Sequence, residues 1–317
     1  MLRRSLILFV LILFLGGCSR TLIATSGAMP IAINRATQTR VMPSFNDVFI
    51  QGRINVSLHT GYAEPKVILR GDPRDLAQVN LSVNNGRLLI LLLKGYPQHG
   101  AVNIEVRTRH LNTFSYKGSG IIDGRRLNSG LLDLFITNPG QTNLGGNINL
   151  GRLEVNGSGY VAIQGIKSSN LQLAVKGNPT IQLSGMVNIS NLNLRGDAKL
   201  SLYWIKSNWL TVRGSGHSVI ELAGIVNKLD LELWDHARFK GRYLRADRLF
   251  AKTHQRSVAE LVAIKRQHTL ATDASDIYFY EIPDMKTDFM AFNGAVLDMR
   301  DLNDPFIEEY TRYNNTF

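Results

Sequence analysis

Carboxylate side chains are the groups with which a β-rich protein would cleave a polysaccharide, so they are the first candidates for chemistry in this sequence. Such catalysis needs two or three carboxylates that project together, one as acid and another as base or nucleophile. Asp230 and Glu232 lie closest, but they alternate with leucines as the outward residues of a strand would. We therefore predict no enzyme; a polysaccharide lyase or hydrolase is the alternative. The acids between residues 113 and 236 are Asp123, Asp133, Glu154, Asp197, Glu221, Asp230, Glu232 and Asp235.

Motifs for metals, nucleophiles and cofactors give no further candidates. The chain has seven histidines and one cysteine, which excludes a multi-thiolate metal site. His236 and His254 lack a third ligand at a metal-binding spacing, so we expect both at corners of the fold. The triplet at 118–120 lacks the lysine and helix of a phosphate-binding loop, and no Gly-x-Ser-x-Gly motif is present. The sequence thus predicts no catalytic residue, no metal and no cofactor.

Basic residues are concentrated in one segment, which is the best candidate for binding. The chain carries a formal charge of +11, and residues 237–266 hold nine basic residues against two acidic ones. Residues 267–317 hold ten acidic residues against three basic ones, so this acidic tail either covers the basic segment or leaves it open. An open segment would bind lipopolysaccharide phosphates or acidic glycans. The candidate strip for an anionic ligand is Arg238, Lys240, Arg242, Arg245, Arg248, Lys252 and Arg256.

Tyr203, Trp204 and Trp209 form a third candidate cluster, near an expected corner of the chain. Exposed aromatic rings would stack on sugar rings, whereas buried rings would contribute to packing. Between these two roles we favour packing.

The N-terminus has the pattern of an export signal. Arg3 and Arg4 precede an apolar run, 6–15, that as a helix would span only about 15 Å, half of a bilayer core. The segment Leu15-Gly16-Gly17-Cys18 resembles the lipobox of bacterial lipoproteins. That resemblance implies a signal peptide over residues 1–17 and an acylated Cys18 that holds the chain in membrane lipid. Ser19, where an inner-membrane lipoprotein often has aspartate, implies the outer membrane. An exported protein is not expected to bind nucleic acid.

A repeat of about nineteen residues organises the middle of the chain. Turn triplets recur at intervals of 18 to 21 residues, and apolar residues alternate between them as in strands that bury one face. This pattern predicts an all-β fold, a parallel β-helix or β-solenoid of about nine rungs over residues 113–281. An antiparallel sandwich is the alternative, but it has no reason to keep a constant interval. The triplets are 118–120, 138–140, 157–159, 177–179, 196–198 and 214–216, with weaker ones at 235–237, 254–256 and 273–275.

The flanking segments are expected to close the ends of the solenoid, because an open end exposes unpaired backbone. Residues 45–112 predict a small β-rich cap, with a capped short helix at Asp72–Leu76 and a hairpin turn at Asn84–Gly86. Residues 282–317 predict an acidic C-terminal cap with a short helix from Asp304 to Tyr310. Residues 18–44 have no sustained periodicity and predict a tether.

These features together resemble the auto-transporter adhesin head GIN domain family. The resemblance rests on the strands that end in Leu111-Asn112-Thr113-Phe114 and on the GSG triplets with their trailing leucines, and it extends from residue 45 to about 280. From residue 235 onward the triplets decay. The resemblance implies an exported or lipidated bacterial envelope protein with a β-helical body and an adhesive role, and it assigns no site residues. We therefore expect a non-catalytic envelope lipoprotein whose rigid body serves adhesion, scaffolding or the binding of envelope polymers.

Overall fold

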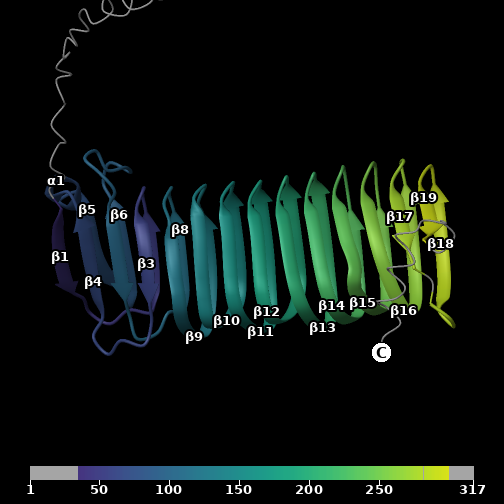
Figure 1. The fold of residues 1–317 in the computed structure, drawn as a ribbon, viewed down its shortest axis with the longest axis horizontal. Helices are drawn as coiled ribbons and strands as arrows, with labels where there is room; N and C mark the ends of the chain where they lie inside the picture. The colour runs from purple at the N-terminus through teal and green to yellow at the C-terminus, as the bar shows by residue number, and fades with distance from the viewer. Residues whose placement is uncertain (1–34, 281, 300–317) are drawn as a thin grey trace, which may run out of the picture. The chain divides into compact units, whose positions relative to one another are not determined.

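The computed structural model describes residues 35–280 and 282–299. Strands make up most of these residues, and no helix among them is long and apolar enough to cross a membrane. The longest strands are the bodies of successive coils, which stack in chain order (Figure 1). They are β9 Ile122–Thr137, β10 Gln141–Gly157, β11 Tyr160–Gly177, β12 Thr180–Gly196, β13 Lys199–Gly216, β14 Val219–Leu233, β15 Arg238–Thr253 and β16 Val258–Thr272.

Each coil pairs in parallel with the next, and the pairing follows the repeat. Leu153 of β10 lies opposite Leu173 of β11, which lies opposite Leu192 of β12. All three are buried, because alternation along a strand sends every second side chain to the inside. Such stacks continue from coil to coil and form one hydrophobic interior. The parallel β-solenoid of about nine turns is confirmed, and the antiparallel sandwich is wrong.

Shifts in register divide the long strands into shorter straight segments. Between β11 and β12 the pairing shifts after Gln164 and again after Ser168. The chain then turns beyond Gly177 to begin the next coil. Eight of the nine predicted triplets lie at these turns, and 214–216 lies at the end of β13 just before its turn, so the sequence interval between triplets is close to the length of one coil. A coil such as β15, with two shifts against β16, is therefore divided into segments, and side chains on different segments do not share one straight strand.

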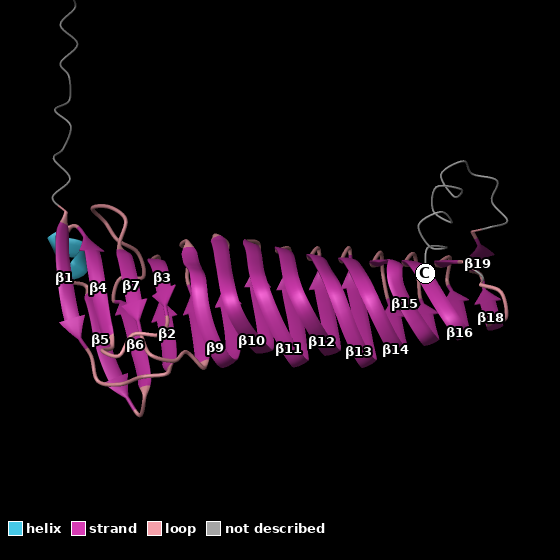
Figure 2. Cartoon of the chain, turned by 60° about the horizontal axis from the view of Figure 1, so that its bottom comes forward, coloured by secondary structure: helices cyan, strands magenta, loops and turns pink. Residues whose placement is uncertain are grey.

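The predicted N-terminal cap contains coils of its own. Strands β2 and β3 stack in parallel on β8 and β9, and β6 and β7 stack in parallel on β2 and β3. Antiparallel pairing also occurs at this end, where β4 pairs with β7 and β5 with β6. Figure 2 shows α1 at this end, beside β1 and β4. The bounds are β2 Asp47–Gln51, β3 Asn55–His59, β4 Lys66–Gly71, α1 Pro73–Leu76, β5 Val79–Asn84, β6 Arg87–Leu92, β7 Asn103–Arg107 and β8 Thr113–Lys117.

Two local predictions in this region are confirmed. Asp72 caps α1, since its side chain accepts a hydrogen bond from the Arg74 backbone N–H at 3.0 Å, and Pro73 is the first helical residue. The turn between β5 and β6 has Asn85 at φ 48° and Gly86 at φ 73°, the left-handed pair that a two-residue hairpin turn requires. Both features depend on a few neighbouring residues, which is why the sequence reveals them.

The structure corrects the boundaries at both ends of the solenoid. Strand β1, Ala36–Val41, lies within the segment predicted as a tether and pairs antiparallel with β4. Its side chains are at most half-buried, so it lacks the apolar alternation that marks the other strands. At the other end, β18 (Lys286–Phe292) pairs in parallel with β16, and β19 (Ala295–Asp298) with β17 (Asp276–Phe279). Part of the predicted acidic cap is therefore a further coil. The predicted helix 304–310 lies outside the described residues.

Glycine is required in the turns because neighbouring coils approach closely there. A Cβ atom added to Gly159 would lie 2.2 Å from the carbonyl oxygen of Gly140, in the turn of the preceding coil. Gly130, in contrast, lies in open space, where an added Cβ would meet no atom within 4 Å. Glycines in the triplets thus allow the backbones of adjacent coils to approach closely.

We expect Gly159→Ala to lower the free energy of unfolding by about 1–3 kcal/mol, because the added methyl group must push two backbones apart. Gly130→Ala is the matched control and should leave stability unchanged. Equilibrium unfolding in urea measures both. Equal midpoints for the two variants would contradict the role of Gly159 in stacking.

Candidate functional site

The seven residues of the predicted basic strip do not form one surface, because β15 carries them around a coil. Arg238 and Lys240 lie on its first segment and Arg248 and Lys252 on its last, with two shifts in register between them. Segments of one coil face different directions, so these pairs do not act on one ligand together. The remaining members are Arg242 and Arg245, in the middle of the coil, and Arg256, in the turn after it.

The stacking of coils brings together a different set of cations. Lys228 lies opposite Arg248, Arg248 opposite Arg266, and Arg266 opposite Lys286. We call these four residues the cationic column. Trp209 lies opposite Lys228 and extends the column by one coil. Of the column, only Arg248 was in the predicted strip. The sequence pattern that would have revealed the column is a basic residue at the same position of the repeat in four successive coils.

Nearby acids do not neutralise most of this column. Asp230 and Glu232 are bound by Arg213 of the preceding coil, at 3.2 and 3.1 Å. Asp288 lies 3.4 Å from Arg266 and 3.1 Å from His268. Among residues 35–280 and 282–299, no carboxylate forms an ion pair with the other three members, which are Lys228, Arg248 and Lys286.

The column has an electrostatic cost. Parallel strands lie about 4.8 Å apart, so each column residue has a like charge at close range in a neighbouring coil. Two unit charges at this distance repel by about 1 kcal/mol in water, less in physiological salt. The charges are exposed, which keeps the cost small. An anionic ligand would remove this repulsion and gain attraction to every member at once.

Two exposed aromatic rings flank the column. Lys228 Nζ lies 5.3 Å from the centre of the Trp209 ring, and Lys252 Nζ lies 5.2 Å from the Phe250 ring. Trp209 is 56% exposed and Phe250 44%. With Arg248, both rings line a shallow hollow of about 260 Å³. The surface therefore offers cations and apolar rings side by side.

The prediction that the aromatic cluster is packed inside is wrong. Trp209 occupies an outward position of β13, with the buried Leu210 next to it. Trp204 is 76% exposed and has φ 68°, which places it at a bend that glycine occupies in neighbouring coils. Tyr203 is also exposed and hydrogen-bonds Glu221 at 3.1 Å. Both tryptophans are thus surface residues, on different parts of the coil.

The other residues considered for chemistry have structural partners. Asp230 and Glu232 do point outward as predicted, and both are held by Arg213. His236 stacks on His217 with ring centres 4.8 Å apart, and His254 lies 3.8 Å from Glu232. No group of three metal-binding side chains is found within the described part of the chain.

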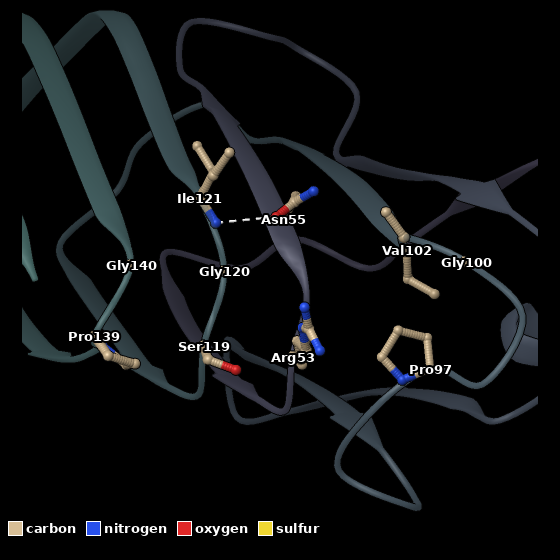
Figure 3. A pocket seen from close by; sticks show the side chains of 11 residues that line it. Arg53, Asn55, Pro97, Gly100, Val102, Ser119, Gly120, Ile121, Pro139 and Gly140 are labelled. Carbon is tan, nitrogen blue, oxygen red and sulfur yellow. Dashed lines mark hydrogen bonds between the residues drawn. The ribbon is translucent and has the colours of Figure 1, made fainter.

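A second hollow of about 630 Å³ lies in the N-terminal part of the solenoid, beside the turns that connect β8 to β9 and β9 to β10 (Figure 3). Its lining consists mainly of turn backbone, including Gly120 and Gly140, and Arg53 is the charged side chain in that lining. Asn55 Oδ1 accepts a hydrogen bond from the Ile121 N–H at 3.0 Å and joins the two walls. With one cation, this hollow is a weaker candidate for anion binding than the column.

One buried carboxylate fixes the rim of this hollow. Burial raises the pKa of Asp75, but three hydrogen bonds outweigh burial and hold this pKa below its ordinary value. The donors are the backbone N–H groups of Gln98, at 2.9 Å, and of His99, at 2.7 Å, and the His99 ring. Asp75 is therefore ionised at neutral pH and binds the loop between β6 and β7 to α1, which gives it a structural role.

Comparison with known proteins identifies the family. Residues 44–216 match the family model described as "Putative auto-transporter adhesin, head GIN domain". The chain belongs to this family. The match covers more than half of the chain and confirms the resemblance seen in the sequence. It ends at Gly216, so this GIN-domain protein carries its cationic column in coils that lie beyond the matched residues.

Solved structures of bacterial proteins are similar to this GIN-domain protein at low identity. A "putative adhesin" from Parabacteroides merdae ATCC 43184 is 12% identical, with a TM-score of 0.42, over 83% of this chain and 96% of that one. A "putative adhesin" from Parabacteroides distasonis ATCC 8503 is 12% identical, with a TM-score of 0.46, over 84% and 97%. A "Putative lipid binding protein" from the same organism is 13% identical, with a TM-score of 0.44, over 84% and 97%. No curated protein matches the sequence.

We expect Arg248→Gln to raise the apparent melting temperature by about 1–2 °C at low salt, since it removes a like charge between Lys228 and Arg266. The gain should vanish in concentrated NaCl, which screens exposed charges. Arg213→Gln should have the opposite effect, because Asp230 and Glu232 lose their partner. Thermal unfolding followed by circular dichroism measures these changes. A salt-independent loss of stability in Arg248→Gln would show that the column is not repulsive.

Proposed function

We propose that this protein is a non-catalytic lipoprotein of the bacterial cell envelope, held by acylated Cys18 in the outer membrane, whose solenoid binds anionic envelope polymers. The cationic column carries this proposal. It places Lys228, Arg248, Arg266 and Lys286 on one rigid surface, one per coil, and three of them have no carboxylate partner among the described residues. An anionic glycan or lipopolysaccharide is the class of partner that such a surface attracts.

The environment of the acids supports a binding role over catalysis. A glycosidase needs one carboxyl group free to protonate the leaving group and another free to act on the sugar. Asp230 and Glu232 are instead both engaged by the same guanidinium group, that of Arg213. The family name describes an adhesin, which also favours binding.

The membrane anchor is supported by sequence alone, because Cys18 lies outside the described residues. The positive residues Arg3 and Arg4, the short apolar run and the small residues before Cys18 are the parts of a lipoprotein signal. More than one acyl chain is needed for durable attachment, since each buried methylene contributes about 0.8 kcal/mol. Export also separates the protein from nucleic acid, which leaves envelope polymers as the accessible polyanions.

We expect the full chain, expressed in a bacterium that is fed labelled palmitate, to become labelled and to fractionate with the outer membrane. Cys18→Ser should lose the label and appear in the soluble fraction, because it keeps the export signal but lacks the acylated thiol. Ser19→Ala is the matched control and should remain labelled. Persistence of the label in Cys18→Ser would refute the anchor.

We expect the full chain in a non-ionic detergent to bind immobilised heparin, used as a test polyanion, and to elute with increasing salt. The double variant Lys228→Gln/Arg248→Gln should elute at clearly lower salt. The matched control, Arg238→Gln/Lys240→Gln, removes the same charge from another segment of the solenoid and should elute close to the wild type. Equal losses in both variants would contradict a specific surface and favour net charge alone. Cleavage of an envelope glycan by the wild type would overturn the non-catalytic role.

A further inference from the structure

We infer that the polymer bound by the cationic column is a linear acidic polysaccharide, with carboxylates on successive sugar residues, which lies along the stacking direction of the coils. This inference rests on the proposed function and specifies its ligand. Three features of the surface support it: the regular spacing of the cations, the exposed rings beside them, and the polar residues of the adjacent column.

The spacing of the cations is set by the backbone and favours a repetitive ligand. Each of the four cations belongs to a different coil, and adjacent coils are about 4.8 Å apart. From Trp209 to Lys286 the surface extends over four such intervals, about 19 Å. A compact anion would contact only one or two members. A linear polymer with a charge on every unit can contact them all.

The aromatic rings favour a sugar polymer over a simple polyanion. Trp209 lies at the start of the column, and Phe250 lies two residues along the strand from Arg248, on the same outward face. Both rings present apolar surface to solvent. The C–H faces of sugar rings pack on such surfaces, whereas a chain of inorganic phosphates has no apolar face.

The adjacent column of outward residues favours a ligand that carries hydroxyl groups as well as charge. In the pairing of the coils, Thr211, Asp230, Phe250, His268 and Asp288 lie opposite one another in order. Asp230 and Asp288 repel a densely charged phosphate chain more strongly than a glycan with one charge per sugar, and their oxygens can accept hydrogen bonds from sugar hydroxyls. Arg248 presents a planar guanidinium group, which can pair with a carboxylate through two parallel hydrogen bonds, whereas Arg266 already pairs with Asp288. A carboxylated glycan satisfies both columns.

The test measures binding of the full chain, in non-ionic detergent, to oligogalacturonates of increasing length by isothermal titration calorimetry. We expect affinity to rise with length until the oligomer covers the column and then to level off. The fully methyl-esterified oligomers, which have the same sugar rings without charge, should bind at least about tenfold more weakly. Inorganic polyphosphate and single-stranded DNA serve as alternative polyanions and should also bind more weakly.

Substitutions on the surface locate the binding. Trp209→Ala should weaken binding of the glycan about tenfold without altering binding of polyphosphate, because only the sugar uses the ring. Trp204→Ala, which removes a more exposed tryptophan from another part of the coil, should change neither. Lys228→Gln/Arg248→Gln should weaken both ligands. All four positions are solvent-facing, and circular dichroism verifies that each variant folds.

The outcomes separate the inference from the proposed function. If polyphosphate or DNA binds the column more tightly than the glycan, the inference is wrong and the proposed binding of anionic polymers stands. If the glycan binds but Trp209→Ala and Lys228→Gln/Arg248→Gln have no effect, the assigned surface is wrong. If none of the polyanions binds, both proposals are wrong.

Discussion

In-register parallel pairing between coils is the constraint on which the rest of the molecule depends. It places each residue opposite the residue at the same position of the next repeat, on the inside and on the outside alike. Inside, it aligns Leu153, Leu173 and Leu192 in a buried stack. Outside, the same rule aligns Lys228, Arg248 and Arg266 at a distance where like charges repel. The interior stabilises the solenoid enough for a repulsive column to persist on its surface.

Features that depend on neighbouring residues were predictable from the sequence. Alternating leucines and a constant interval between turns indicate a solenoid, Asp72 and Pro73 indicate a helix start, and Asn85-Gly86 indicates a hairpin. Features that depend on distant pairing were not. Strand β1 has no apolar pattern of its own and exists through its pairing with β4. Likewise, β2 and β3 join the solenoid because later strands stack on them.

The candidate site shows the same limit. Basic residues that are close in sequence, such as Arg238 and Arg248, are carried to different segments by the bends of one coil. Basic residues one coil apart, such as Lys228 and Arg248, become neighbours. The interval between turns varies from 18 to 21 residues, and shifts in register fall inside the coils, so the exact partners follow only from the structure. The exposure of Trp209 likewise depends on where β13 bends, which the sequence alone does not reveal.

The placement of Arg213 decides the character of the surface. Asp230 lies two residues along the strand from Lys228 and would be its natural partner, but Arg213 of the preceding coil binds both Asp230 and Glu232. Had Arg213 been neutral, these acids would be available to pair with the column. Because one cation engages two acids, Lys228 and Arg248 have no carboxylate partner among the described residues, whereas Arg266 pairs with Asp288. Since Arg213 pairs with both nearby acids, the column retains its positive charge, and the repulsion between its members lowers the stability of the solenoid. Such a cost in stability is expected where charged residues serve the binding of a ligand.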